Sequence, residues 1–152
     1  MTERFEVARL IAADRAEIFA LLRSPAGHVA IDSSGMLQSA DGPAVTAVGD
    51  EFVVHMDRES LNDRPMGKYD VRVIITAYVE GDVIEWTVAG MGYPPLEHRY
   101  GYQLESVDGG TRVTSYYDWS RVHNKLRGVF PIIPEAGIRA TLGILARTVE
   151  TP

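Results

Sequence analysis

His98 is the side chain in this sequence that is best suited to acid–base chemistry. The pKa of a free histidine lies near neutral pH, and in an extended strand His98 shares one face with Tyr100 and Tyr102 because successive side chains alternate between faces. A histidine in such surroundings can exchange a proton with a bound molecule. The alternative is a histidine at a strand end, hydrogen-bonded to Glu97 or to solvent. The sequence leaves both open.

The other histidines give weaker signals. His28 and Asp32 are four residues apart, so one short helix would bring them together, either to handle a proton or to hold a turn in place. His55 and Asp57 share a strand face that we assign to solvent, which predicts a surface pair. The four histidines follow no metal-binding spacing, and segment 90–92 lacks the third glycine of a dinucleotide loop. We therefore expect no metal and no cofactor.

Composition narrows the class of protein. The 152 residues carry a net charge of −6, so they offer no basic face for a nucleic acid. The absence of cysteine excludes disulfides and thiolate zinc sites. A strand pattern begins almost at once, without a charged and then apolar leader, and no apolar run approaches the ~20 residues of a membrane helix. We expect a cytoplasmic protein that binds no nucleic acid and does not insert into a membrane.

The order of elements predicts an α+β fold. A strand at 4–12 precedes two short helices, the first capped by Asp14 with Glu17 in a capping box and the second beginning at Ser24 and Pro25. Turn residues follow near Gly35, with a further strand possible at 35–40. The remaining strands are expected at 51–58, 68–79, 82–89, 97–107 and 111–121. The chain then forms one long helix that ends near residue 150.

That last helix carries an apolar stripe formed by Ile138, Leu142, Leu145 and Val149. A single terminal helix after a continuous run of strands must bury its stripe against the sheet. We therefore expect a helix-grip arrangement, in which a curved antiparallel sheet wraps around the C-terminal helix in one domain over residues 1–152. Such an arrangement tends to enclose a pocket.

Strand alternation places many aromatic side chains on the face toward this helix. Several have polar tips, and this combination fits the wall of a pocket better than a dry core. Thr141 either points its hydroxyl into the pocket or bonds it to the preceding turn, and Thr148 has the same two possibilities. The predicted ligand-binding residues are Phe52, Met56, Tyr69, Trp86, Tyr100, Tyr102, Tyr117, Trp119, Ile138, Thr141, Leu142 and Leu145.

Several segments together resemble the START-like, or SRPBCC, superfamily, and most closely its bacterial polyketide cyclase/dehydrase branch. The segments are 28–35, 49–52 with Met56 beyond it, Tyr69, 83–86, 109–114, 117–120 and the helix at 142–146. The resemblance spans roughly residues 3–150. It implies the helix-grip fold and a hydrophobic ligand between the sheet and the C-terminal helix. It transfers no catalytic motif, because the superfamily shares a cavity and not a catalytic signature.

Three functions follow as expectations. The first is binding of a small or medium hydrophobic molecule, a lipid or a polyketide-like compound, by a monomer or homodimer. The alternative is a polyketide aromatase/cyclase or dehydratase without metal or nucleotide cofactor, in which His98 transfers protons. The third is a protein-interaction or co-chaperone module, which predicts a filled core and an exposed apolar patch instead of a cavity.

Overall fold

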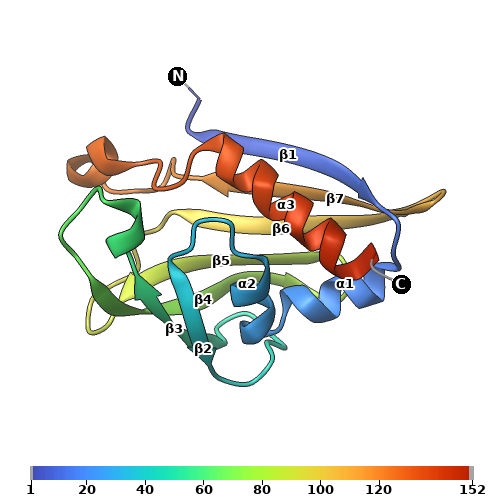
Figure 1. Cartoon of the computed structure of the whole chain (residues 1–152), viewed down its shortest axis with the longest axis horizontal. Coiled ribbons are helices and arrows are strands. Elements are labelled where there is room, and N and C mark those ends of the chain that lie inside the picture. The colour runs from blue at the N-terminus through green and yellow to red at the C-terminus, as the bar shows by residue number, and fades with distance from the viewer. Residues whose placement is uncertain (1, 151–152) are drawn as a thin grey trace.

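A curved sheet of seven antiparallel strands forms the body of the protein (Figure 1). The computed structural model describes residues 2–150. The strands lie in the order β1-β7-β6-β5-β4-β3-β2, so the first strand of the chain pairs with the last. Their bounds are β1 Arg4–Ile11, β2 Leu37–Asp41, β3 Glu51–Asp57, β4 Lys68–Val79, β5 Val83–Gly90, β6 Arg99–Val107 and β7 Gly110–Asp118.

Three α-helices accompany the sheet: α1 (Arg15–Leu22), α2 (Pro25–Ile31) and α3 (Glu135–Glu150). Two short 3-10 helices, η1 (Glu59–Leu61) and η2 (Asn124–Val129), lie in loops. This is the helix-grip fold that the order of elements predicts. The further strand near residues 35–40 is present as β2.

The starts of the two short helices follow from their first residues. The hydroxyl of Ser24 accepts the N–H of Gly27 at 3.3 Å, and Pro25 occupies the first turn of α2. The predicted capping box at α1 is wrong. Asp14 is at the N-cap, but the N–H of Glu17 donates to the carbonyl of Asp14, at 3.1 Å, and the Asp14 side chain makes no capping bond.

The strands β6 and β7 are each two residues shorter than the sequence suggests, for local reasons. β7 ends at Asp118, whose carboxylate accepts the N–H and the hydroxyl of Ser120 and so turns the chain. β6 begins at Arg99 and not at residue 97, because Glu97 has a left-handed backbone with φ of 70°. His98 therefore lies just before the strand.

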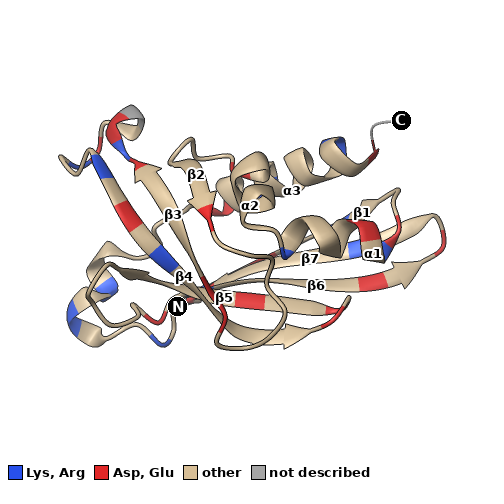
Figure 2. Ribbon diagram, turned by 90° about the horizontal axis from the view of Figure 1, so that it is seen from below, with Lys and Arg blue, Asp and Glu red and all other residues tan. Residues whose placement is uncertain are grey.

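Alternation along the strands separates the two faces of the sheet. On β4, the charged residues Lys68, Asp70 and Arg72 form the coloured bands in Figure 2, and the buried Val71 and Val73 alternate with them and point to the other face. The uncharged face is the concave one, toward the helices.

Tyr116 departs from this pattern, since it is buried although it lies on the outer face of the sheet. Its ring lies over Gly101 of the neighbouring strand, where a Cβ atom would overlap it. The guanidinium of Arg4 lies 4.3 Å from the ring centroid, and the hydroxyl donates to Glu85 at 2.7 Å. The glycine in β6 thus makes room for an aromatic cover on the outside of the sheet.

Helix α3 buries Ile138, Leu142, Leu145 and Ala146, and Val149 is partly buried. It packs on β1 and β7 and against α1 and α2. The part of the concave face that β3, β4 and β5 form lies to one side of the contact between α3 and the sheet.

Replacing Leu142 by alanine tests whether the stripe holds the helix. Leu142 is 1% exposed within the core cluster, so Leu142→Ala is expected to lower the free energy of unfolding by ~2–5 kcal/mol in urea melts. Arg139→Ala is the matched control on the same helix, because its side chain is 65% exposed, and a change within ~0.5 kcal/mol is expected. A loss below ~0.5 kcal/mol for Leu142→Ala would show that the stripe is not packed.

Candidate functional site

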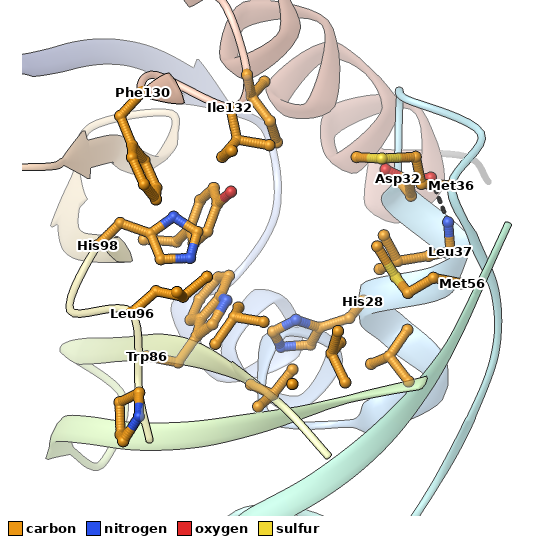
Figure 3. A pocket seen from close by; sticks show the side chains of 18 of the residues that line it. His28, Asp32, Met36, Leu37, Met56, Trp86, Leu96, His98, Phe130 and Ile132 are labelled. Atoms are coloured by element: carbon orange, nitrogen blue, oxygen red, sulfur yellow. Dashed lines mark hydrogen bonds between the residues drawn. The ribbon is translucent and has the colours of Figure 1, made fainter. Parts of the chain in front are cut away.

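A cavity of about 930 Å³ opens between the concave face of the sheet, helix α2 and the start of α3 (Figure 3). Its size falls within the range of pockets that enclose small ligands. The apolar wall includes Val54, Val71, Val73, Val88 and Ile138, and the rim is formed by loops around residues 64–66, 93–97 and 121–133.

A row of stacked aromatic rings runs from the cavity wall into the core. Trp86, Tyr100 and Tyr117 are directly opposite one another on β5, β6 and β7. The Trp86 and Tyr100 rings are 5.7 Å apart and 16° from parallel, and the Tyr100 and Tyr117 rings are 4.3 Å apart and 15° from parallel. Antiparallel register therefore converts single aromatic residues on three strands into one flat, rigid surface.

The predicted site residues divide into two groups. The residues that line the cavity are Met56, Tyr69, Trp86, His98, Tyr100, Tyr102, Ile138 and Thr141. The residues that lie in the core beside it are Phe52, Tyr117, Trp119, Leu142 and Leu145.

Four of these core residues pack against neighbours beside the cavity. Leu142 and Leu145 belong to the stripe by which α3 contacts the sheet. Trp119 packs edge-on against Phe5 of β1 at 4.8 Å between ring centroids. Phe52 packs against His28 at 5.1 Å.

The segment between β7 and α3 contributes residues that strand and helix patterns do not identify. Leu126, Val129, Phe130, Ile132 and Ile133 all line the cavity. Leu126 and Val129 are also partly exposed, at 41% and 39%. The available signal was a run of apolar residues in a segment with prolines and no period of 2 or 3.6, which is unusual for a loop that faces water only.

His28 and Asp32 do not pair, and the predicted His–Asp contact is wrong. The Nε2–H of His28 donates to the carbonyl of Leu22 at 2.7 Å, which satisfies a carbonyl at the end of α1. Asp32 accepts bonds from Ser34, from the N–H of Gly35 and from the N–H of Leu37. Asp32 therefore holds the turn after α2. Burial lowers the pKa of His28 to about 4.

His55 is on the outer face of β3, but it does not pair with Asp57. Its ring nitrogens contact Asp70 at 2.8 Å and Asp41 at 2.6 Å, across both neighbouring strands. Hydrogen bonds to these two carboxylates raise the pKa of His55.

His98 is 3% exposed and lies in the cavity wall between Phe130 and Leu96 (Figure 3). Its Nδ1 atom is 2.8 Å from the hydroxyl of Tyr117. Glu97 pairs with Arg99 at 3.2 Å, so the predicted alternative of a His98–Glu97 bond does not occur. Burial lowers the pKa of His98 to about 4, and the ring is therefore neutral at neutral pH.

Three further polar side chains of the wall, Ser33, Thr141 and Arg58, bond within the protein. The hydroxyl of Ser33 donates to the carbonyl of Gly137 at 2.9 Å and lies 2.8 Å from that of Thr141. Arg58 forms a two-pronged pair with Asp63, at 2.9 and 2.7 Å, and its third nitrogen contacts the sulfur of Met36. Away from the cavity, the hydroxyl of Thr148 bonds back to the carbonyl of Ile144, one of its two predicted arrangements.

Residues 2–150 contain neither a metal-binding group of side chains nor a helix that could span a membrane. No three histidine, aspartate or glutamate side chains in that range come together as a group that could hold a metal ion. No helix within the same residues is long and apolar enough to cross a membrane.

Comparison with known sequences finds a relative but no matching family model. The chain is 30% identical over 145 residues to the uncharacterized protein Rv0088 of Mycobacterium tuberculosis. The match covers 90% of this chain and 59% of the relative, so this chain spans about three fifths of the length of the relative.

Comparison with solved structures gives matches over almost the whole chain. Protein CV1439 of Chromobacterium violaceum matches with a TM-score of 0.69 and 15% identity, covering 100% of both chains. An AHSA1-like protein of Aeromonas hydrophila matches at 0.64 and 17%, covering 97% and 92%. DynU16, from the dynemicin biosynthetic locus, matches at 0.64 and 17%, covering 99% of this chain and 48% of its own. At these identities the likeness shows a shared fold alone.

The neutral state of His98 predicts a pH-dependent stability. The folded pKa is about 4 and the unfolded pKa is ~6.5, so between these values the unfolded chain binds more protons. The free energy of unfolding is therefore expected to fall as the pH is lowered from ~6.5 towards 4, by roughly 1–2 kcal/mol from His98 between pH 6.5 and 5.

Urea melts at about pH 7 and about pH 5 measure this loss in the wild type and in His98→Gln. The variant should lose less stability on acidification, although His28, whose pKa is lowered by the same cause, keeps part of the dependence. Equal pH dependence of the two proteins would contradict a buried, neutral His98.

Proposed function

We propose that this protein binds a small or medium hydrophobic molecule in the cavity between the sheet and helix α3. The observation that carries this proposal is a 930 Å³ space walled mainly by apolar and aromatic side chains. A cavity of this size forfeits packing contacts that a filled core would make, so a ligand that occupies it recovers buried apolar contact.

The arrangement of polar groups supports an uncharged or weakly polar ligand. His28, Ser33 and Arg58 already have partners within the protein. The aromatic row of Trp86 and Tyr100 offers a flat surface for planar or extended apolar groups. An interaction module with a filled core would not require this space.

The finer proposal is that the ligand is a lipid or a polyketide-like compound, and that the chain belongs with the polyketide cyclase/dehydrase-like branch as one START-like domain. The likeness to DynU16, whose name places it in the dynemicin biosynthetic locus, supports this choice. The predicted ligand contacts are Met56, Tyr69, Trp86, Tyr100, Tyr102, Ile138 and Thr141, with the core residues Phe52, Tyr117, Trp119, Leu142 and Leu145 acting behind them.

Filling the cavity tests the proposal. The neutral fluorescent probe N-phenyl-1-naphthylamine is expected to bind the wild type with one site per chain, and Val88→Trp should weaken binding by roughly tenfold or more because the larger ring occupies the space. Arg112→Trp is the matched control, since Arg112 is exposed on the other face of the sheet. Equal affinity of Val88→Trp and the wild type would place the probe elsewhere and overturn the proposal.

A second candidate function is an aromatase/cyclase or dehydratase reaction in the same cavity. The specific observation that favours it is a buried histidine in the cavity wall, held by a tyrosine hydroxyl. A pKa of about 4 makes the neutral His98 a weak base at neutral pH, which favours binding as the primary function.

Turnover of an aromatic polyketide mimic by wild type and His98→Gln separates the two functions. Proton transfer by His98 predicts a ~10²–10⁴-fold loss of turnover with binding retained. The binding function predicts no turnover by the wild type and a modest change in affinity. If the wild type turns over the mimic, and His98→Gln binds it without turnover, then catalysis and not binding is the primary function.

A further inference from the structure

One nitrogen in the cavity wall has no hydrogen-bond partner. Among the described side chains, the buried polar atoms without a partner are Nε of Arg72, Oγ1 of Thr87, Nε2 of His98 and Nε of Arg99. Of these residues, His98 alone lines the cavity. A buried polar atom without a partner is costly, by roughly 1–3 kcal/mol, so it points to a missing partner.

The hydroxyl of Tyr117 determines which kind of partner is missing. This oxygen accepts the N–H of Ile132 at 3.3 Å and lies 2.8 Å from Nδ1 of His98. A tyrosine oxygen has two acceptor sites and one hydrogen to donate. The N–H of Ile132 and the hydroxyl of Tyr100 both hydrogen-bond to this oxygen and fill its acceptor sites, so its own hydrogen goes to Nδ1. A neutral imidazole has one N–H, so the proton of His98 is on Nε2.

The surroundings of His98 select against a charged partner. Its ring contacts are the aromatic rings of Tyr100, Tyr117 and Phe130, at 5.0 to 5.6 Å between centroids. Burial is the sole cause of its pKa shift, so no carboxylate or cation acts strongly on the ring. A charged ligand group would lose its hydration here without a countercharge.

We infer that the ligand carries an uncharged hydrogen-bond acceptor, a ketone or ester carbonyl oxygen, that receives the Nε2–H of His98. This inference rests on the proposed binding function and specifies its ligand class. Tyr117 acts as a positioning residue, because its hydroxyl holds the proton of His98 on Nε2.

Access to Nε2 requires a small movement of a neighbouring side chain, because this atom is buried without ligand. Leu96 lies beside His98 in Figure 3 and belongs to the irregular segment between β5 and β6. It is 36% exposed, so its displacement by the ligand disturbs little packing. The carbonyl oxygen then takes the position next to Nε2.

Two matched probes test the inference by competition with N-phenyl-1-naphthylamine. 2-Acetylnaphthalene has a carbonyl group, and 2-isopropenylnaphthalene has a methylene group in place of the carbonyl oxygen and cannot accept a hydrogen bond. The ratio of their dissociation constants is expected to favour the ketone by roughly tenfold more in the wild type than in His98→Phe. Tyr117→Phe should reduce the preference in part, and His55→Gln, a histidine on the outer face, should preserve it.

The outcomes separate this inference from the binding function. An equal ketone preference in wild type and His98→Phe overturns the inference and leaves the binding function intact. Failure of both probes to bind the wild type overturns both. If His98→Phe does not fold, ¹⁵N NMR of the wild-type histidines decides, because a protonated Nδ1 in His98 overturns the inference and a protonated Nε2 supports it.

Discussion

The apolar stripe of helix α3 packs on one side of a sheet that is wider than the helix. The buried side chains of the stripe meet β1 and β7, and the helix also rests on α1 and α2. Because one helix covers only a band of the curved sheet, α1 and α2 cover part of the inner faces of β3, β4 and β5, and the rest of these faces borders the cavity. The cavity results from this difference in width between the helix and the sheet. The position of α3 therefore decides which side chains form the cavity wall.

Desolvation shapes the chemistry of the space that remains. His28 and His98 are both buried, and burial lowers the pKa of each to about 4, so both are neutral side chains that donate or accept single hydrogen bonds. His28 uses its N–H to satisfy the end of α1, whereas the corresponding nitrogen of His98 has no partner. The two buried, neutral histidines thus differ in role because only one of them has a partner for its Nε2 atom. His28 stabilises the fold through this bond, and His98 is available to a ligand.

The fold was predictable because it depends on periodic patterns. The stripe from Ile138 to Leu145 and the alternation around Val71 and Val73 identify the helix and the inner face without knowledge of the register. The division between cavity wall and core was not predictable in the same way. Tyr100 and Tyr117 are opposite each other on one face, yet Tyr100 lines the cavity and Tyr117 is fully buried. The distance of each residue from α3 decides between wall and core. That distance depends on the tertiary structure and cannot be read from a strand pattern. The loop that contains Phe130 has no period and was therefore missed.

The central claim, that a ligand occupies the space beside α3, is tested most directly by methyl NMR. Methyl-labelled protein titrated with N-phenyl-1-naphthylamine should show shifts concentrated on the wall residues Val54, Val71, Val73 and Val88. The methyl groups of Leu10 and Val79, which are exposed outside the lining, should keep their positions. Shifts confined to exposed methyl groups, with the wall valines unchanged at saturation, would contradict the account.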